Sequence, residues 1–288
     1  LWPGIMPGRA ERALPWPAVY AIHRVMGHQD TITACALVIG NEVLSGRTKD
    51  ANLNWLASRC TEMGIRLAEA RVIPDVEDVI VDAINECRAK YTYVFTTGGI
   101  GPTHDDITAA CIAKAFGVEI ERRKEAVELL ESFIKKENLN EARLKMAEVP
   151  VGAELIYNPV SKAPGFRMQN VYVMAGVPSI MRAMFEGYAP SLLTGKQVLS
   201  ESVACYLPEG AVARGLSEIQ DRYPDVDIGS YPFMRSGNFG CTLVSRGTDA
   251  DELKQIVSEI KDMIVSLGGE PIDKDLVTPE DEKSPDDY

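Results

Sequence analysis

A short segment near the middle of the chain combines glycines with adjacent acidic side chains. An apolar, β-branched run over residues 91–97 leads into a Gly-Gly-Ile-Gly turn at 98–101, and a helix-like pattern follows directly. Glycines tolerate positive φ and have no Cβ, so the backbone N–H groups of such a turn can face an anion such as phosphate. Asp105 and Asp106 fall in the first turn of the expected helix. Two carboxylates beside a phosphate pocket need a cation such as Mg²⁺ between them, so the segment predicts a metal-assisted phosphate site.

Each part of this pattern also has a purely structural explanation. The turn lacks the Gly-Lys-Ser/Thr of a Walker A motif and the last glycine of GxGxxG, where His104 stands, so a tight strand–helix turn accounts for it equally well. Thr103-x-x-Asp106 resembles a capping box, and an aspartate in a first helical turn complements the helix dipole. Asp105 has no such explanation on a chain that is already acidic. His104 either takes part in acid–base chemistry or only contacts solvent, and the chain has no His/Cys spacing typical of a zinc site.

A further acid, Glu42, follows the first expected strand. In doubly wound α/β folds, the loops at the carboxyl ends of the strands line the ligand crevice. The strands over 31–39 and 91–97 both end at that edge, so Glu42 and the 98–106 loop are predicted to share one pocket. The structural alternative for Glu42 is a solvated loop acid.

Strand-like and helix-like patterns alternate regularly from residue 31 to about residue 195. The expected strands are 31–39, 65–73, 91–97 and 118–121, followed by a hairpin over 166–175 that turns at Gln169-Asn170. The expected helices run from Asp50 to Gly64, from about Asp75 to Cys87, from the glycine loop to about Phe116, and over 124–136, 140–147 and 176–188. This alternation predicts an α/β domain over 31–195, with a parallel sheet covered by helices on both faces.

Beyond a boundary at residues 195–197 the order of the elements changes. The patterns predict a strand over 198–206, a helix over 209–223, paired strands over 226–234 and 239–246, and a helix over 249–267. This order is typical of a small α+β domain, which we place at 196–272. It carries no recognisable acid–base or metal-binding constellation, so we expect it to shape assembly or to cover the pocket.

The composition limits the partners and surroundings of the chain. A formal net charge of -12 argues against a nucleic-acid partner, which would favour a basic face. No apolar run approaches the roughly 20 residues that a membrane-spanning helix needs. The six cysteines are far apart and contain no CxxC, which indicates a reduced, cytoplasmic protein.

The two ends of the chain have a different composition. Residues 1–30 contain four prolines and no regular apolar pattern. They lack the continuous apolar region of a secretory signal, so we interpret them as a disordered or over-extended segment ahead of Met26 rather than as a targeting peptide. Residues 273–288 are acidic and proline-containing, and we predict that they are disordered.

Several motifs together resemble one known family, the molybdopterin-binding (MoaB/Mog-like) domains. The motifs are Gly40-Asn41-Glu42-Val43-Leu44-Ser45-Gly46 with Asp50-x-Asn52, the glycine loop from Thr96 to Thr108, Asn158-Pro159, Ala163-Pro164-Gly165-Phe166, and Gly176-Val177-Pro178-x-x-Met181. The glycine loop is similar to the version in competence/damage-inducible protein A (CinA) and its relatives. Residues 198–272 look like the second module of stand-alone CinA N-terminal-type proteins.

This resemblance implies a three-layer α/β domain that binds a pterin or a nucleotide diphosphate over the glycine loop. In the CinA branch, the activity is metal-dependent hydrolysis of ADP-ribose to AMP and ribose 5-phosphate, and the related domain of FAD synthases acts on FAD. In the molybdenum-cofactor branch, the domain adenylates molybdopterin, and its loop commonly carries a basic residue at the position of Asp105. That departure favours the hydrolytic branch. Full-length CinA proteins continue into a nicotinamide-mononucleotide deamidase domain, for which this sequence has no counterpart, so we expect no deamidase activity.

From these patterns and this resemblance we predict a metal-dependent, pyrophosphatase-type hydrolase of nucleotide diphosphates such as ADP-ribose or FAD, which releases AMP. The expected catalytic residues are Asp105, Asp106 and His104. The expected ligands of a divalent metal (Mg²⁺, Mn²⁺ or Co²⁺, with a monovalent cation as a further candidate cofactor) are Glu42, Asp105 and Asp106. The expected substrate-binding residues are Gly40, Glu42, Asp50, Asn52, Thr97, Gly98, Gly99, Gly101, Thr103, Pro164, Gly165, Gly176 and Pro178.

Two alternatives from other classes remain open at this point. One is a molybdopterin-binding or molybdopterin-adenylylating protein, and the other is a non-catalytic nucleotide-binding protein. In each case the expected partner is a small nucleotide or pterin. The family resemblance also implies a homo-oligomer.

Overall fold

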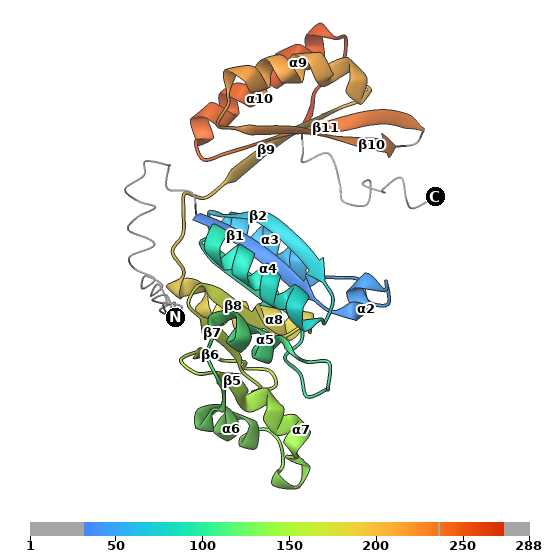
Figure 1. Ribbon diagram of the computed structural model, residues 1–288. Coiled ribbons are helices and arrows are strands. Elements are labelled where there is room, and N and C mark those ends of the chain that lie inside the picture. Colours follow the sequence, from blue (N-terminus) through green and yellow to red (C-terminus); the bar gives the residue numbers. More distant parts are fainter. Residues whose placement is uncertain (1–31, 236, 274–288) are drawn as a thin grey trace, which may run out of the picture. The chain divides into compact units, whose positions relative to one another are not determined.

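The computed structural model describes residues 32–235 and 237–273. The expectations for residues 1–30 and for the tail beyond residue 273 therefore lie outside the described residues. Within the described ranges the chain forms two compact units, which separate between Gly195 and Lys196. Figure 1 shows the first unit in blue to yellow and the second in orange to red.

A six-stranded sheet forms the centre of the first unit, in the order β2-β1-β3-β8-β7-β6. Its strands are β1 (Ile32–Ile39), β2 (Ile65–Ile73), β3 (Tyr93–Thr97), β6 (Glu154–Ile156), β7 (Gly165–Met168) and β8 (Val171–Met174). Strands β2, β1, β3 and β8 run parallel, and β7 and β6 add antiparallel pairs at one edge. The mainly parallel sheet predicted from the sequence is confirmed. The predicted hairpin between β7 and β8 is present too, and Gln169 adopts a φ of +53° in its turn.

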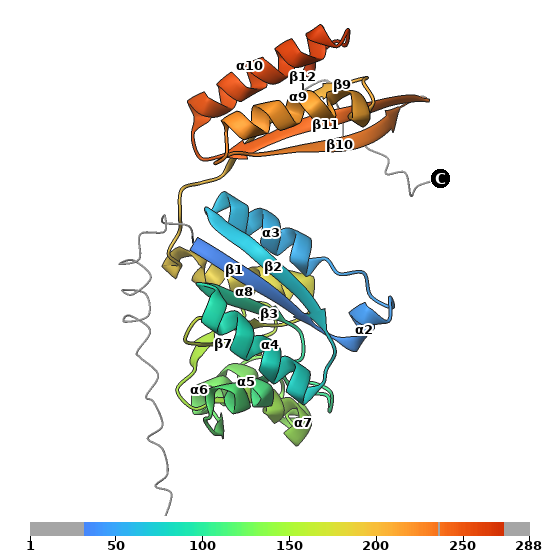
Figure 2. The same ribbon diagram turned by 45° about the horizontal axis from the view of Figure 1, so that its top comes forward.

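Helices cover both faces of this sheet, which gives three layers. The helices around it are α2 (Asn41–Leu44), α3 (Asn52–Glu62), α4 (Glu77–Lys90), α5 (Thr108–Phe116), α8 (Pro178–Tyr188) and the 3-10 turn η3 (Ala189–Ser191). In β1, Ala34 and Ala36 join the cluster of α3 and α8, whereas Cys35 and Leu37 join the cluster of α4 and α5. This division follows because successive side chains of a strand point to opposite faces. Figure 2 shows α3 and α4 on opposite sides of β1 and β2.

The order of the strands brings the carboxyl ends of β1 and β3 side by side. The loop after β1 leads to α3 on one face of the sheet, and the loop after β3 leads to α5 on the other face. The two loops therefore diverge. These loops are residues 40–51 and 98–107, and they contain most of the predicted site residues.

A smaller substructure, green in Figure 1, lies between α5 and β6 in the chain. Its elements are β4 (Ile120–Arg122), α6 (Lys124–Glu131), the 3-10 turn η1 (Lys136–Asn138), α7 (Glu141–Leu144), the 3-10 turn η2 (Lys145–Ala147) and β5 (Glu148–Pro150). Strands β4 and β5 pair antiparallel, and Ala126, Leu130 and Ala147 form a small core. The helix predicted over 124–136 is therefore too long, and the one predicted over 140–147 divides into α7 and η2.

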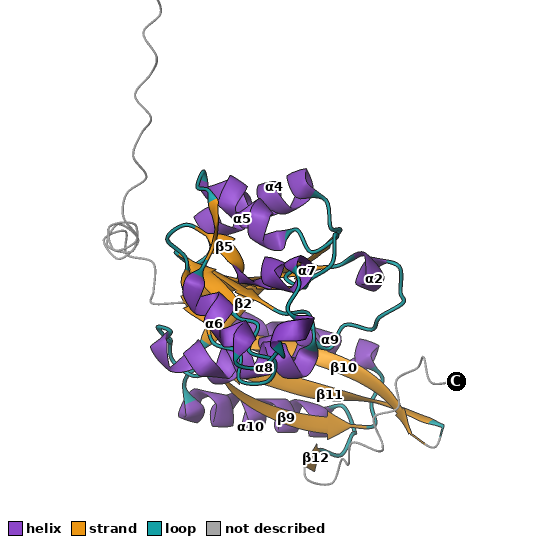
Figure 3. Ribbon diagram, turned by 90° about the horizontal axis from the view of Figure 1, so that it is seen from below, coloured by secondary structure: helices purple, strands orange, loops and turns teal. Residues whose placement is uncertain are grey.

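The second unit is a four-stranded antiparallel sheet with two helices. Its elements are β9 (Leu199–Cys205), α9 (Glu209–Arg222), β10 (Asp227–Arg235), β11 (Asn238–Gly247), α10 (Ala250–Ser266) and β12 (Ile272–Asp273), and the strand order is β10-β11-β9-β12. Figure 3 shows β9, β11 and β10 side by side. The α+β module predicted from the sequence is confirmed, but β12 was missed because two residues carry no periodic pattern. None of the described helices is both long and apolar enough to span a membrane.

Two local predictions in the first unit need correction. Asp75 does not cap α4, which follows Val76 without a side-chain cap. The Asp75 carboxylate instead accepts the backbone N–H of Asn41 at 2.9 Å and joins the loops after β1 and β2. Helix α5 begins at Thr108 rather than directly after the glycine turn, so Asp105 and Asp106 precede the helix instead of lying in its first turn.

Candidate functional site

The glycines after β3 are required by the close approach of three chain segments. Gly98 and Gly99 have φ values of +104° and +68°, which side chains disfavour. A Cβ on Gly98 would lie 2.0 Å from the carbonyl oxygen of Ile39, at the end of β1. A Cβ on Gly99 would lie 2.1 Å from the hydroxyl of Thr108, at the start of α5. The turn therefore brings the ends of β1 and β3 and the start of α5 into direct contact.

The same turn leaves backbone donors unused. Thr108 binds the carbonyl oxygens of the turn. Its N–H donates to Gly99 O at 3.0 Å, and its hydroxyl donates to Gly98 O at 3.1 Å. Across the described ranges, no acceptor receives the N–H groups of Gly99, Ile100 or Gly101, which are only half-buried. Backbone donors without an internal partner bind water or a ligand, and successive unpaired N–H groups in a turn attract an anion. The loop can therefore receive a phosphate.

Asp106 folds back onto its own loop. Its Oδ2 accepts the backbone N–H of Thr103 at 2.8 Å and also the Thr103 hydroxyl. A Cβ on Gly101 would lie 2.6 Å from this oxygen, so the third glycine makes room for the carboxylate. Only half of a capping box is present, because the Asp106 N–H donates to the Thr103 carbonyl at 3.3 Å and not to its hydroxyl, and the pairing closes a turn within the loop without capping α5. One carboxylate oxygen of Asp106 remains without a protein donor in the described chain.

Asp105 and His104 lie at the tip of the loop. Their side chains are 60% and 99% exposed, with His104 Nδ1 3.9 Å from Asp105 Oδ1. The Thr103 hydroxyl, followed by the Asp105 backbone N–H, lowers the pKa of the Asp105 carboxyl below its ordinary value. Asp105 is therefore ionised at neutral pH and open to a cation. His104 contacts solvent rather than a buried partner.

Glu42 does not join these acids. It lies in α2, and its carboxylate folds over Gly40, where a Cβ would lie 2.5 Å from both of its oxygens. Over residues 32–235 and 237–273, no three His, Cys, Asp or Glu side chains are grouped so that they could hold a metal ion. The structure thus does not bring Glu42 together with Asp105 and Asp106 as predicted, because the two loops diverge from the sheet. The acids that remain on the glycine loop are Asp105, whose side chain is 60% exposed, and Asp106, which has one carboxylate oxygen without a donor in the described chain.

Asn52, at the start of α3, joins the end of β3 to the residues that follow β8. Its Nδ2 donates to Thr97 Oγ1 at 2.8 Å and to Gly176 O at 2.7 Å, and Thr97 Oγ1 donates to Ala175 O at 3.0 Å. Asn52 is only 4% exposed, and its Oδ1 has no hydrogen-bond partner among the described residues. An unpaired buried acceptor costs about 1–3 kcal/mol unless a ligand or water donates to it. The amide oxygen is enclosed by the protein, and Asn52 does not line the cavity beside the glycine loop.

The other predicted residues of this edge have structural roles. Asp50 caps α3, because its carboxylate accepts the N–H groups of Asn52 at 3.3 Å and Leu53 at 2.9 Å. A Cβ on Gly165 would lie 2.3 Å from Val173 O, and one on Gly176 would lie 3.4 Å from the Cα of Gly98. Pro178 is the first residue of α8. These residues set the close packing of strand ends beside the glycine loop.

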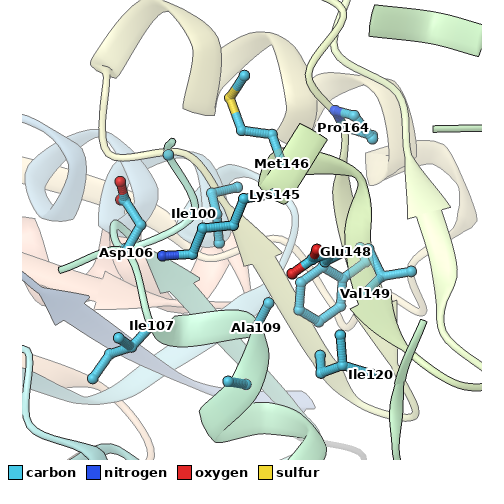
Figure 4. Close-up of a pocket in the computed structure, with 14 residues that line it drawn as sticks. Ile100, Asp106, Ile107, Ala109, Ile120, Lys145, Met146, Glu148, Val149 and Pro164 are labelled. Atoms are coloured by element: carbon cyan, nitrogen blue, oxygen red, sulfur yellow. The ribbon is translucent and has the colours of Figure 1, made fainter. Parts of the chain in front are cut away.

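A cavity of about 100 Å³ opens beside the glycine loop, as Figure 4 shows. Four of its lining residues were predicted from the sequence: Gly99, Gly101, Asp106 and Pro164. The lining residues that were not among the predicted site residues are Ile100, Ile107, Ala109, Ala110, Ile120, Lys145, Met146, Glu148, Val149 and Phe166. Most of the lining side chains are therefore apolar. The charged lining residues are Asp106 on the glycine loop, and Lys145 and Glu148 on the small substructure.

Lys145 and Glu148 come from the small substructure, far from the glycine loop in sequence. The Lys145 ammonium donates to the carbonyl oxygen of Thr103 at 2.6 Å and so reaches the rim of the loop. The sequence indicated a short helix over 140–147, and Asn140 does cap α7 by accepting the N–H of Arg143 at 3.0 Å. No local pattern could indicate that this helix returns to the glycine loop. The Ala163-Pro164-Gly165-Phe166 motif was the available signal for Phe166.

Comparisons with known proteins agree with this fold. Residues 35–194 match the family described as "probable molybdopterin binding domain", and residues 197–267 match the family described as "FAD synthase, middle domain". The first match covers more than half of the chain. The chain therefore belongs to the molybdopterin-binding (MoaB/Mog-like) domain family, in its CinA-type branch.

Several individual proteins are similar to this chain over much of its length. The crystal structure of the protein CinA, of unknown function, from Thermoplasma acidophilum is 29% identical, with a TM-score of 0.54, and the match covers 57% of this chain and 100% of that one. A protein of Pyrobaculum calidifontis is 38% identical over 211 residues, which are 69% of this chain and 80% of the relative. A probable FAD synthase of Caenorhabditis elegans is 29% identical over 258 residues, which are 81% of this chain and 50% of the relative. The family resemblance seen in the sequence motifs is confirmed.

Proposed function

We propose that this chain is a metal-dependent hydrolase that splits nucleotide diphosphates such as ADP-ribose and releases AMP. The observation that carries the proposal is the pairing of two features in one loop. Three unused N–H groups, those of Gly99, Ile100 and Gly101, lie a few residues before the carboxylates of Asp105 and Asp106. Donors alone would suit any anion, and carboxylates alone would repel one. Their combination suits a diphosphate that arrives with a divalent cation.

Each group of the loop has a role in this proposal. The three N–H groups bind phosphate oxygens and orient the diphosphate against the loop. Asp105 and the unpaired oxygen of Asp106 would hold Mg²⁺, Mn²⁺ or Co²⁺ together with the substrate phosphates. When bound, such a cation polarises a phosphoryl oxygen and lowers the pKa of an attacking water. His104, at the exposed tip, is the candidate for moving a proton to or from that water.

FAD is the second candidate substrate. It shares an adenylate joined through a diphosphate with ADP-ribose, so the same loop would recognise both. The observation that favours FAD is the match of residues 197–267 to the middle domain of FAD synthases, together with the similarity to the probable FAD synthase over 258 residues. Transfer of adenylate to molybdopterin is the competing reaction of the wider family. What argues against it is Asp105, because the resemblance implies a basic residue at this position in the molybdenum-cofactor branch.

The test measures which adenylate product forms. The protein is incubated with ADP-ribose, with FAD, or with molybdopterin and ATP, each with and without Mg²⁺, Mn²⁺ or Co²⁺, and the products are separated by chromatography. We expect AMP from ADP-ribose or FAD only when a metal is present. An adenylylated pterin, or binding without any turnover, would contradict the proposal and would support a transferase or a non-catalytic binding protein respectively.

A further inference from the structure

The geometry points to Lys145 as the side chain that binds the substrate diphosphate opposite the N–H groups of the glycine loop. This inference rests on the function proposed above and adds a specific cation to its phosphate site. The Lys145 ammonium lies 2.6 Å from Thr103 O, and the side chain lines the same cavity as Gly99, Gly101 and Asp106. Figure 4 shows it extended across the cavity, with the amino group directed towards the loop that carries Asp106.

The fold holds the backbone of Lys145 from both sides. Before it, Asn140 caps α7 and so fixes the start of the short helix that leads into η2. Around it, the guanidinium of Arg122 joins Glu141 and Glu148, each at 2.9 Å, and these two residues flank η2. After it, Ala147 is fully buried in the small core. A lysine on such a fixed segment loses less freedom on binding a ligand than one on a mobile loop.

The charges around the cavity show why an anionic ligand would need this residue. Among the cavity-lining residues of the described chain, Lys145 carries the one positive charge, whereas Asp106 and Glu148 carry negative charges. The whole chain has a net charge of -12, so long-range attraction does not favour an anion. An ammonium has three donors. One is used by Thr103 O, and the other two have no partner in the described ranges, so they are available to phosphate oxygens.

The competing explanation is that Lys145 only fastens the glycine loop to η2. A fastening residue would change the stability of the protein, and its loss would weaken every ligand of the loop through disorder. A phosphate contact would change affinity for anions and would also reduce the dependence of binding on salt, because one charge pair is lost. The two explanations therefore differ in melting temperature and in salt dependence.

The experiment uses the full chain and three variants. Lys145→Met removes the charge but keeps the apolar stem, and Lys145→Arg keeps a charge. Lys124→Met is the matched control, because Lys124 is 90% exposed at the start of α6 and lies outside the cavity lining. Binding of inorganic pyrophosphate and of ADP-ribose is measured by calorimetry with Mg²⁺ and, separately, in EDTA, at several salt concentrations. AMP is quantified in the same samples, so that binding is read separately from turnover.

We expect Lys145→Met to weaken both ligands about 10- to 100-fold, as the loss of a hydrogen-bonded charge typically does, and to flatten the salt dependence. The affinity of Lys145→Arg for both ligands should stay within a few-fold of wild type. Lys124→Met should bind both ligands as tightly as wild type. The melting temperature of Lys145→Met without ligand should stay close to wild type.

Three results would overturn the inference. They are unchanged affinity in Lys145→Met, a lowered melting temperature with an unchanged salt dependence, or no binding of either ligand by the wild-type protein. The failure of the proposed function looks different. If wild type binds ADP-ribose through Lys145 but releases no AMP with any metal, the phosphate contact stands and the hydrolase does not.

Discussion

Helices α5 and α10 begin in opposite ways, although the sequence places aspartates near both starts. At α10, the Asp249 carboxylate accepts the N–H groups of Asp251 at 2.9 Å and Glu252 at 3.1 Å, and both of these residues add negative charge to the first turn. At α5, no side chain caps the helix and the first turn has no acid. The positive end of the helix dipole is thus neutralised at α10 and left open at α5.

This difference separates an acid that serves folding from acids available for binding. In the second unit, the Asp249 carboxylate accepts hydrogen bonds from the first turn of its own helix. In the first unit, the loop pairs one oxygen of Asp106 with Thr103 and leaves Asp105 and the N–H groups of the glycine turn open. Unused polar groups cost stability, so a fold retains them where they act on a ligand. The contrast between the two helix starts predicts different effects of substitutions in the two units.

The largest effect is expected when the negative charge of one of the loop acids is removed. Asp105→Asn and Asp106→Asn should each reduce AMP release from ADP-ribose by about 100-fold or more, because a bound cation contributes several kcal/mol to transition-state stabilisation. The melting temperature should change little, since Asn keeps the acceptor that Thr103 uses in Asp106. Turnover is measured at several Mg²⁺ concentrations. Activity near wild type in both variants would remove support for the metal site, and Asp249→Asn serves as the control.

A second test places a Cβ into the glycine turn. Gly98→Ala should destabilise the protein by about 3 kcal/mol, because a positive φ and a contact 2.0 Å from Ile39 O both oppose the methyl group. The measurement is the free energy of unfolding in urea. Gly187→Ala in the exposed part of α8 is the matched control and should be neutral or slightly stabilising, because nothing lies within 4 Å of its Cβ. Equal stabilities for the two variants would show that the turn is not tightly packed.

A third test removes the side-chain cap of α10, a feature that α5 does not have. Asp249→Ala should speed hydrogen exchange at the N–H groups of Asp251 and Glu252 by about fivefold, because both lose their acceptor. AMP release should remain at the wild-type rate, since Asp249 belongs to the other unit. Unchanged exchange at these two amides would contradict the assignment of Asp249 as the cap.

The smallest effect is the pH dependence of the same cap. The N–H groups of Glu252 and Asp251 lower the pKa of Asp249 from its ordinary value of 3.8. Its contribution to stability is therefore complete above that value and is lost as the pH falls through the lower pKa of the folded state. The difference in melting temperature between wild type and Asp249→Ala should narrow below about pH 3.8. A constant difference from pH 7 to acidic conditions would rule out this linkage.

Local sequence patterns determined most of the elements of this protein. The apolar periods predicted β1, β2, β3, α10 and the hairpin of β7 and β8, and Gly64 ends α3 with a φ of +69°. The glycine turn and its neighbouring acids were also recognised as one segment. These features were readable because strand and helix periods, caps and positive φ values depend on residues only a few positions apart.

Tertiary structure decided how the groups of the site meet. It turned the Asp106 carboxylate towards Thr103 instead of α5, directed the Asn52 amide to Thr97 and Gly176, and kept Glu42 apart from the other acids. It also brought Lys145 back to the loop across 42 residues of chain. Contacts over such distances depend on how the strands are ordered and how the small substructure packs. No short stretch of sequence carries that information, because the energy that fixes it comes from burial shared among distant segments.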